Sequence, residues 1–224
     1  MKKTQEGLLA LGMLFAVALI LSNVVAAKVV ATGIPMPGGT LVFPGAVFCY
    51  AITFLVTDVV GEVWGRREAR AIVRWGFAAQ LLAAALLLFT QALPAASPEV
   101  QGAYRTLLGQ NWAFVGASLV AYAISQSWDV FVFHRLRDAV LARHPDGRGR
   151  RWIWNNASTM SSQLLDTVVF VGLAFGCGLG WLFDAAMRPA LFSLMLGQYL
   201  VKVLLAALDT IPFYLLTRRD ASPE

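Results

Sequence analysis

Two apolar segments carry nearly the same stretch, Gln126-Ser-Trp-Asp129-Val-Phe-Val-Phe133 and Gln163-Leu-Leu-Asp166-Thr-Val-Val-Phe170. Residues three and four apart share a helix face, so each stretch presents an amide, a carboxylate and an aromatic ring to one side. An aspartate at the centre of a bilayer costs at least about 2.5 kcal/mol on insertion scales, and such residues turn inward to line a site or cavity. The two stretches therefore predict one helical Gln-x-x-Asp unit that is used twice and faces a space between helices.

The composition is that of a membrane protein. The 224-residue chain is 58% hydrophobic and 14% charged, with a mean hydropathy of +0.65, whereas a typical soluble domain is about 25% charged. A helix needs about 20 residues to cross a bilayer, and apolar runs of about that length recur along the chain. The expected spans are Leu8–Val30, Gly45–Val60, Ile72–Leu93, Trp112–Phe133, Thr159–Leu182 and Pro189–Leu216. The predicted fold is all-α, a polytopic membrane protein of six transmembrane helices, with one integral membrane domain over residues 1–224.

The placement of arginine and lysine predicts the orientation of these spans, because cytoplasmic loops carry the excess of both residues. With a cytoplasmic N-terminus, only Arg105 and Arg188 fall outside, while Lys28 and Lys202 fall within spans. The residues that fall inside are Lys2, Lys3, Arg66, Arg67, Arg70, Arg74, Arg135, Arg137, Arg143, Arg148, Arg150, Arg151, Arg218 and Arg219. Both termini are therefore expected in the cytoplasm. A nucleic-acid partner is not expected, because the net charge of +5 is spread over several loops.

The segments between the spans carry their own expectations. The first apolar run exceeds twenty residues and is expected to be retained as a span instead of being cleaved as a signal peptide. Ala31–Pro44 is free of charge and rich in Pro and Gly, which predicts an external loop, and Pro94–Gln110 is expected to be a polar loop. Arg135–Asn156 is expected to be an arginine-rich loop, after which Asn156 or Ser158 caps the next helix.

Polar residues in the other spans extend the candidate site. Gln198, Lys202 and Asp209 share one helix face, and the same holds for Tyr50, Phe54, Asp58 and Glu62. At about 1.5 Å of rise per residue, Asp58, Asp129, Asp166 and Asp209 all lie roughly 9 to 14 Å from the cytoplasmic boundary. One shared cavity is therefore expected. Its candidate substrate-binding residues are Asn23, Asp58, Gln126, Asp129, Phe133, Asn156, Gln163, Phe170, Asp166, Gln198 and Lys202.

Ordinary structural roles stay open for some of these positions. Lys28 could extend to the membrane interface, and Asn23 could bond a neighbouring helix. Lys202 is expected to pair with Asp166 or Asp209, because an unpaired ammonium is costly at that depth. Cys49 and Cys177 lack the spacing of a metal site. Small residues at Gly172, Gly176, Gly178 and Gly180 could pack within one protomer or between the two protomers of a homodimer.

Several short motifs occur in order along nearly the whole chain. They are Ser22-Asn23 with Lys28; Asp58-Val-Val-Gly-Glu62-Val-Trp-Gly65 with Arg70; Gln126-x-x-Asp129-Val-Phe-Val-Phe133; Asn155-Asn156-Ala-Ser158-Thr159 followed by Gln163-x-x-Asp166; and Lys202 with Asp209-Thr-Ile-Pro212. Taken together, they resemble the queuosine-precursor transporters, also described as the vitamin-uptake-transporter-like family of bacterial inner-membrane proteins. The chain departs from that pattern at Trp64, where tyrosine is usual, and at Asn155, where arginine is usual.

The resemblance implies a multi-pass protein of the bacterial inner membrane that is no enzyme and needs no cofactor. Its partners would be the lipid bilayer and a small deazapurine, either 7-cyano-7-deazaguanine or 7-aminomethyl-7-deazaguanine, imported as a precursor of the modified tRNA base queuosine. The candidate residues suit such a ring. Its neighbouring N–H donors match a carboxylate, its O6 matches an amide N–H, and its flat face matches an aromatic ring.

Other functions are weighed against this one. A substrate-binding membrane subunit of an ATP-energised vitamin-type uptake system is the main alternative; the sequence contains no Gly-x-x-x-x-Gly-Lys-Ser/Thr, so ATP would act through another chain. An intramembrane aspartyl protease is disfavoured, because Gly178-Leu-Gly180 is followed by Trp181 and not by Asp. A structural scaffold leaves the polar faces unexplained. We expect secondary transport, either linked to protons or simply facilitated.

Overall fold

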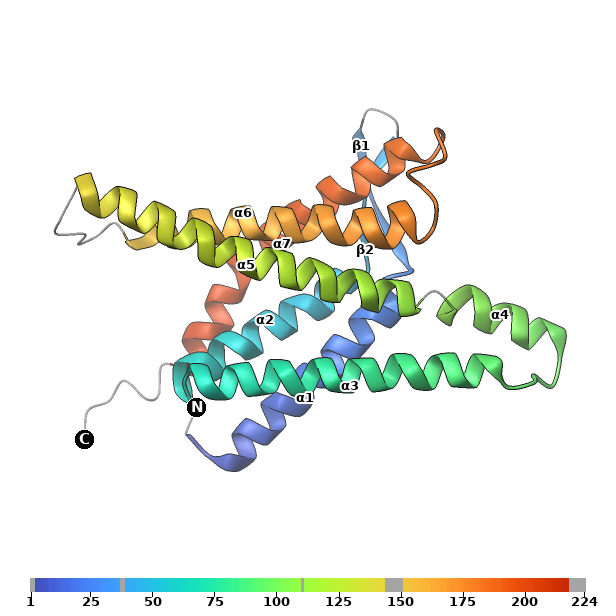
Figure 1. Ribbon diagram of the computed structural model, residues 1–224, viewed down its shortest axis with the longest axis horizontal. Coiled ribbons are helices and arrows are strands. Elements are labelled where there is room, and N and C mark those ends of the chain that lie inside the picture. Colours follow the sequence, from blue (N-terminus) through green and yellow to red (C-terminus); the bar gives the residue numbers. More distant parts are fainter. Residues whose placement is uncertain (1–2, 37–38, 110, 144–150, 218–224) are drawn as a thin grey trace.

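The computed structural model describes residues 3–36, 39–109, 111–143 and 151–217, which form a bundle of helices with one small β-hairpin (Figure 1). In chain order the elements are α1 (Gln5–Val25), β1 (Val29–Met36), β2 (Gly39–Pro44), α2 (Ala46–Val63), α3 (Arg66–Ala92), α4 (Pro98–Leu108), α5 (Asn111–Arg143), α6 (Arg151–Val171), the π-helix η1 (Gly172–Cys177) and α7 (Arg188–Thr217). The turn between α2 and α3 uses Gly65 with φ of 99°, a conformation that side chains with a Cβ rarely adopt.

Six helical stretches of the described residues are long and apolar enough to cross a membrane, so the predicted six-helix membrane protein is confirmed at this level. In Figure 1 the start of α1, the turn between α2 and α3, and the end of α7 lie at one end of the bundle. The hairpin and α4 lie at the opposite end. The chain thus returns to the end at which it starts, which is what an even number of crossings requires.

The prediction of an all-α chain is wrong between α1 and α2. Here β1 and β2 pair antiparallel from Val29 opposite Pro44 to Met36 opposite Gly39, with an irregularity between Ala31 and Pro35. Proline and glycine excluded a helix, as expected, but the β-branched residues of this stretch favour an extended backbone. A hairpin forms because it pairs most of the backbone groups that a plain loop would leave unsatisfied.

Several helix boundaries also differ from the expectation. The segment predicted to be a polar loop contains α4, whose first turn is capped by Ser97, with Pro98 as the first helical residue. The predicted arginine-rich loop is mostly helix, because α5 continues to Arg143 and α6 already begins at Arg151. The expected cap at Asn156 or Ser158 is therefore wrong, since both positions lie within α6. Arginine, leucine and alanine are good helix formers, so these helices extend past their apolar parts.

The small-residue face after α6 packs inside the protomer. A Cβ at Gly172 would meet Met195, and one at Gly176 would meet Leu191 and Leu182. Gly172 and Gly176 thus face side chains of the same protomer at ordinary van der Waals distance, which agrees with the first of the two roles that the sequence left open. The predicted homodimer stays a prediction.

The hairpin rests on α7 through its backbone. Ser193 Oγ donates to the carbonyl oxygen of Thr40 at 2.9 Å and accepts the backbone N–H of Val42 at 3.3 Å. One turn further along α7, a Cβ on Gly197 would overlap the carbonyl oxygen of Val42. Only glycine allows the strand to approach this closely. Because Gln198 is the next residue, the hairpin also fixes the part of α7 that carries candidate site residues.

We expect Gly197→Ala to lower the free energy of unfolding by about 1–3 kcal/mol, the usual cost of overpacking a tight contact. Helix propensity alone would make the alanine variant more stable by about 1 kcal/mol. A loss of stability would therefore show that the close contact with β2 outweighs helix propensity. Thermal unfolding of the purified protein in detergent measures it. Gly61→Ala is the matched control, because an added Cβ on this helical glycine meets no atom within 4 Å. A stabilised Gly197→Ala protein would show that β2 does not rest on α7.

Two apolar cores hold the helices together. One contains Phe114, Phe170, Phe175 and Leu194 with their neighbours, and joins α5, α6, η1 and α7. The other joins α1 to α2 through Phe15, Leu19, Val56 and Val60, with residues of α3 packed against it. Tyr50 of α2 packs against both cores. The space between the two cores is where the polar residues collect.

Candidate functional site

A cavity of about 210 Å³ lies between α1, α2 and α3 on one side and α5, α6 and α7 on the other. Its polar lining residues are Tyr50, Thr53, Thr57, Ser118, Tyr122, Ser125, Gln126, Gln163, Asp166 and Gln198. Its apolar lining residues are Phe15, Leu19, Phe54, Val73, Phe77, Ala121 and Phe170. Sites for drug-sized ligands enclose about 300–1,000 Å³. This smaller volume favours a ligand with a single small ring system.

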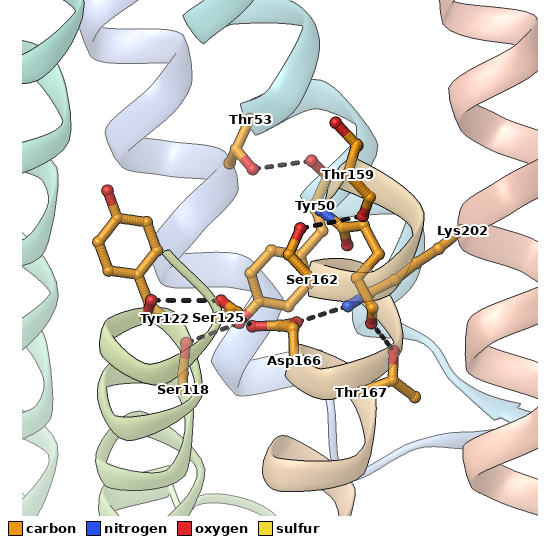
Figure 2. A network of polar contacts seen from close by, with 11 residues as sticks. Tyr50, Thr53, Ser118, Tyr122, Ser125, Thr159, Ser162, Asp166, Thr167 and Lys202 are labelled. Atoms are coloured by element: carbon orange, nitrogen blue, oxygen red, sulfur yellow. Dashed lines mark hydrogen bonds and ion pairs between the residues drawn. The ribbon is translucent and has the colours of Figure 1, made fainter. Parts of the chain in front are cut away.

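Asp166 is the charged centre of the cavity (Figure 2). Lys202 Nζ of α7 donates to Asp166 Oδ2 at 2.6 Å, and Ser125 Oγ of α5 donates to Asp166 Oδ1 at 3.4 Å. The Lys202 side chain is 6% exposed, whereas that of Asp166 is 25% exposed. The predicted charge pairing of Lys202 with an intramembrane carboxylate is thus confirmed, with Asp166 as the partner. The short ion pair fixes one carboxylate oxygen, and the long hydrogen bond leaves the other accessible to a ligand donor.

Tyr50 of α2 also lines the cavity. Its hydroxyl lies 2.8 Å from Ser118 Oγ, and its ring meets the ring of Phe170 edge to face, with centroids 6.5 Å apart. On the same helix, Thr53 Oγ1 donates back to the Tyr50 carbonyl oxygen at 2.7 Å, which satisfies the threonine hydroxyl within α2 (Figure 2). The cavity therefore combines one carboxylate, several hydroxyls and aromatic rings.

Two amides that line the cavity have buried acceptor oxygens with no hydrogen-bond partner among the described residues. Gln163 Oε1 and Gln198 Oε1 are both buried and make no hydrogen bond in the described part of the chain. Gln198 is only 2% exposed, and both residues line the cavity. An unpaired buried polar group costs about 1–3 kcal/mol, and native structures normally pair such groups with protein, water or ligand. The two amides indicate that the cavity is shaped to hold something polar.

The structure gathers only part of the predicted site. Gln126, Gln163, Asp166, Phe170 and Gln198 line the cavity, and Lys202 adjoins it through Asp166.

The other predicted residues lie elsewhere. Asp129 accepts a hydrogen bond from Ser162 Oγ at 3.2 Å outside the lining, and Phe133 packs edge to face on His134. Asn23 is buried and donates to the Leu19 carbonyl oxygen at 3.3 Å. Asp58 lies on an exposed face of α2. The side chains of Asn156 and Asp209 fall outside the described part of the chain.

Helix geometry explains the placement of Asp58. The cavity face of α2 carries Tyr50, Thr53, Phe54 and Thr57, at helical spacings of three and four. Asp58 is the next residue after Thr57, and it is turned about 100° away from that face, because an α-helix has 3.6 residues per turn. The expected stripe of residues four apart therefore turns gradually away from the cavity.

The sequence interpretation missed the hydroxyl residues of the site. Ser125, which lines the cavity, immediately precedes Gln126, and Ser162 precedes Gln163 in the same way, so comparing the two Gln-x-x-Asp units one position further would have found Ser125. Ser118 carries no such signal. Serine is common in helices that pack closely in membranes, and only its contact with Tyr50 identifies it.

Comparison with known proteins agrees with a transporter. A family model described as "Putative vitamin uptake transporter" matches residues 44–216. The chain is 36% identical over 130 residues to the "Probable queuosine precursor transporter" of Bacillus subtilis (strain 168), covering 56% of this chain and 53% of the relative. It is 30% identical over 174 residues to the "Queuosine precursor transporter" of Escherichia coli (strain K12), covering 75% of this chain and 69% of the relative. The first match thus spans about half the length of the Bacillus subtilis protein. No solved structure matches the chain.

Proposed function

This chain belongs to the vitamin uptake transporter family, and from that membership we propose that it imports a queuosine precursor across a bacterial inner membrane. The substrate class is 7-cyano-7-deazaguanine, 7-aminomethyl-7-deazaguanine or both. The names of the two relatives support a queuosine precursor in general, and the two compounds are those that the sequence resemblance implies. The arginine-rich end of the bundle, where α1 starts and α7 ends, would face the cytoplasm, because positive residues mark that side.

Asp166 is the observation that carries the proposal. Among the described residues, Lys202 holds one oxygen of the carboxylate, and a 3.4 Å hydrogen bond from Ser125 is the one contact to the other. A carboxylate has about four lone-pair sites, so it can accept two ligand donors in addition to the lysine. The ring N–H and the exocyclic amino group of a deazaguanine are two such donors on one edge. They would replace Ser125 and bind Asp166 as a bidentate pair.

The remaining groups of the ring find partners in the same cavity. The amides of Gln163 and Gln198 can each turn to offer N–H or C=O, so they suit the O6 acceptor and an aminomethyl donor. Phe170 and Tyr50 provide an apolar wall for the flat ring. The cavity volume of about 210 Å³ suits one bicyclic base and not a nucleotide.

Selectivity follows from the polarity of the bound edge. Adenine presents a ring nitrogen acceptor where a deazaguanine presents an N–H donor, so its lone pair would face the Asp166 carboxylate. A mismatch that leaves a buried polar group unpaired costs about 1–3 kcal/mol, which corresponds to roughly 5- to 150-fold in affinity. Adenine should therefore bind much more weakly than a deazaguanine.

We expect liposomes that contain this chain alone to exchange labelled 7-aminomethyl-7-deazaguanine without ATP. Transport would be facilitated or linked to protons, and an enzyme in the cytoplasm would trap the product. The assay measures entry of label with and without an imposed pH gradient, and protein-free liposomes are the control. A tenfold excess of unlabelled deazaguanine should block entry of the label, whereas the same excess of adenine should inhibit entry much less.

The same assay decides between the proposal and its alternative. If neither accumulation nor exchange occurs under any gradient, while the purified chain still binds the base, a partner subunit is missing. The chain would then be the substrate-binding membrane subunit of an ATP-energised uptake system. If the chain does not bind the base at all, the proposed substrate class is wrong.

A further inference from the structure

The repeated unit includes a serine in addition to its Gln and Asp. Ser125-Gln126-x-x-Asp129 recurs as Ser162-Gln163-x-x-Asp166. The helices that carry the two copies, α5 and α6, run antiparallel and side by side (Figure 1). Ser125 Oγ lies within donating distance of Asp166 Oδ1 at 3.4 Å, and Ser162 Oγ lies within donating distance of Asp129 Oδ1 at 3.2 Å. Each hydroxyl can alternatively donate to the carbonyl oxygen three residues earlier, that of Tyr122 at 3.2 Å or that of Thr159 at 2.9 Å. Each serine thus reaches the aspartate of the other copy, which is the reciprocal pattern that a two-fold axis produces.

This local two-fold axis orders the polar groups along the bundle. Ser125 lies level with Asp166, and Ser162 lies level with Asp129. Asp129 follows Ser125 by four residues on α5, so at about 1.5 Å of rise per residue the two carboxylates are about 6 Å apart along the helix axis. Gln126 and Gln163 fall between these levels and line the cavity. Asp129 lies just beyond them, toward the arginine-rich end of α5.

The two carboxylates differ in their partners. Asp166 is paired with Lys202. Asp129 is partly buried, and its one hydrogen bond within the described residues comes from the neutral hydroxyl of Ser162. Most of its lone-pair sites are therefore available to accept N–H donors. Asp129 thus offers the same acceptor chemistry as Asp166, and no ammonium group is paired with it among the described residues.

We propose that Asp129 and Ser162 form a second binding station for the same donor edge of the ligand, on the cytoplasmic side of the cavity. This inference rests on the proposed function. A ligand released from Asp166 would keep hydrogen bonds to Gln126 and Gln163 and then bind Asp129, so its N–H groups are never left without an acceptor. The local two-fold axis places the two stations at successive levels along α5 and α6, which suits passage from one side to the other.

The test separates binding from transport in the full-length purified chain, with labelled 7-aminomethyl-7-deazaguanine as the probe. We expect Asp129→Asn to keep equilibrium binding within about threefold of the wild type, while exchange in liposomes becomes at least about tenfold slower. Asp166→Asn should lose both. Asp138→Asn, an exposed aspartate on the same helix α5, is the matched control and should change neither.

Each outcome decides the inference. If Asp129→Asn exchanges the base at the wild-type rate, or loses binding as severely as Asp166→Asn, there is no second station. Should Asp129→Asn fail to fold, as judged by size-exclusion chromatography, Ser162→Ala answers the same question, with unchanged binding and slowed exchange as the expected result. Failure of the wild-type chain to bind the base would instead reject the proposed function.

Discussion

Asp166→Asn should abolish uptake of 7-aminomethyl-7-deazaguanine and weaken its binding by about 100-fold. Asparagine keeps the volume of the side chain, but it replaces one acceptor oxygen with an NH₂ donor that would face the N–H donors of the ligand. Hydrogen bonds to a charged group contribute about 1.5–3 kcal/mol each, so losing this carboxylate costs about 3 kcal/mol or more. Equilibrium binding to purified protein and uptake by intact cells measure the two effects.

A loss of folding must be distinguished from this loss of recognition. Asp166→Asn also leaves Lys202 without its charged partner, which can destabilise the protein by itself. The double variant Asp166→Asn/Lys202→Met removes the unpaired ammonium group. It should regain stability while still failing to bind the base. If the double variant binds the base like the wild type, Asp166 is a structural residue and the site assignment is wrong.

The fold was predictable wherever the bilayer restricts the chain. Spans of apolar residues and the distribution of arginine depend on local composition, and six candidate spans are present as expected. The hairpin from Val29 to Pro44 was not predictable in the same way. It is held by Ser193 and Gly197 of α7, which lie more than 140 residues away in the sequence. Local Pro and Gly signals exclude a helix, but they do not show that a distant helix will hold two strands.

The candidate site was predictable where a sequence repeat marks a helix face. Gln126, Gln163 and Asp166 line the cavity because the face that they share is directed toward the space that residues of α1, α2, α3 and α7 also line. Asp58 belongs to no repeat, and its depth was the main argument for it. Depth fixes the level of a residue along a helix but not its direction around the axis. The rotation of α2 is set by the packing of Val56, Val59 and Val60, whose burial no periodicity of polar residues reveals.

The sequence alone also could not show which of the two aspartates of the repeat pairs with a lysine. Asp129 and Asp166 have equivalent neighbours along the chain, yet only Asp166 receives Lys202. The difference arises because α7 packs on α6 near one copy of the unit. Tertiary structure thus gives the two aspartates of a symmetrical sequence pattern different partners among the described residues, Lys202 for Asp166 and Ser162 for Asp129.

Lys202→Met is expected to lower the free energy of unfolding by about 3–5 kcal/mol, the usual effect of removing one partner from a buried ion pair. Lys202 lies near the middle of α7, with about 21 Å of helix toward Arg188 and about 22 Å toward Thr217 at 1.5 Å per residue. Half of a hydrocarbon core is only about 15 Å thick, so an ammonium group at the middle of this helix lies deep in the membrane. Its partner in the described part of the chain is Asp166, at 2.6 Å.

Transport should fall together with stability in Lys202→Met, because the lysine fixes the carboxylate that binds the ligand. Thermal unfolding in nanodiscs and exchange in liposomes measure the two effects. Lys28→Met is the matched control, since Lys28 is exposed between α1 and β1 and should tolerate the change. Adding Asp166→Asn to Lys202→Met should restore stability but not transport, because a neutral pair no longer leaves a buried charge unpaired but still lacks the acceptor. If Lys202→Met keeps full stability and full exchange, the ion pair has no role in holding Asp166, and the ligand must be bound by other residues of the cavity.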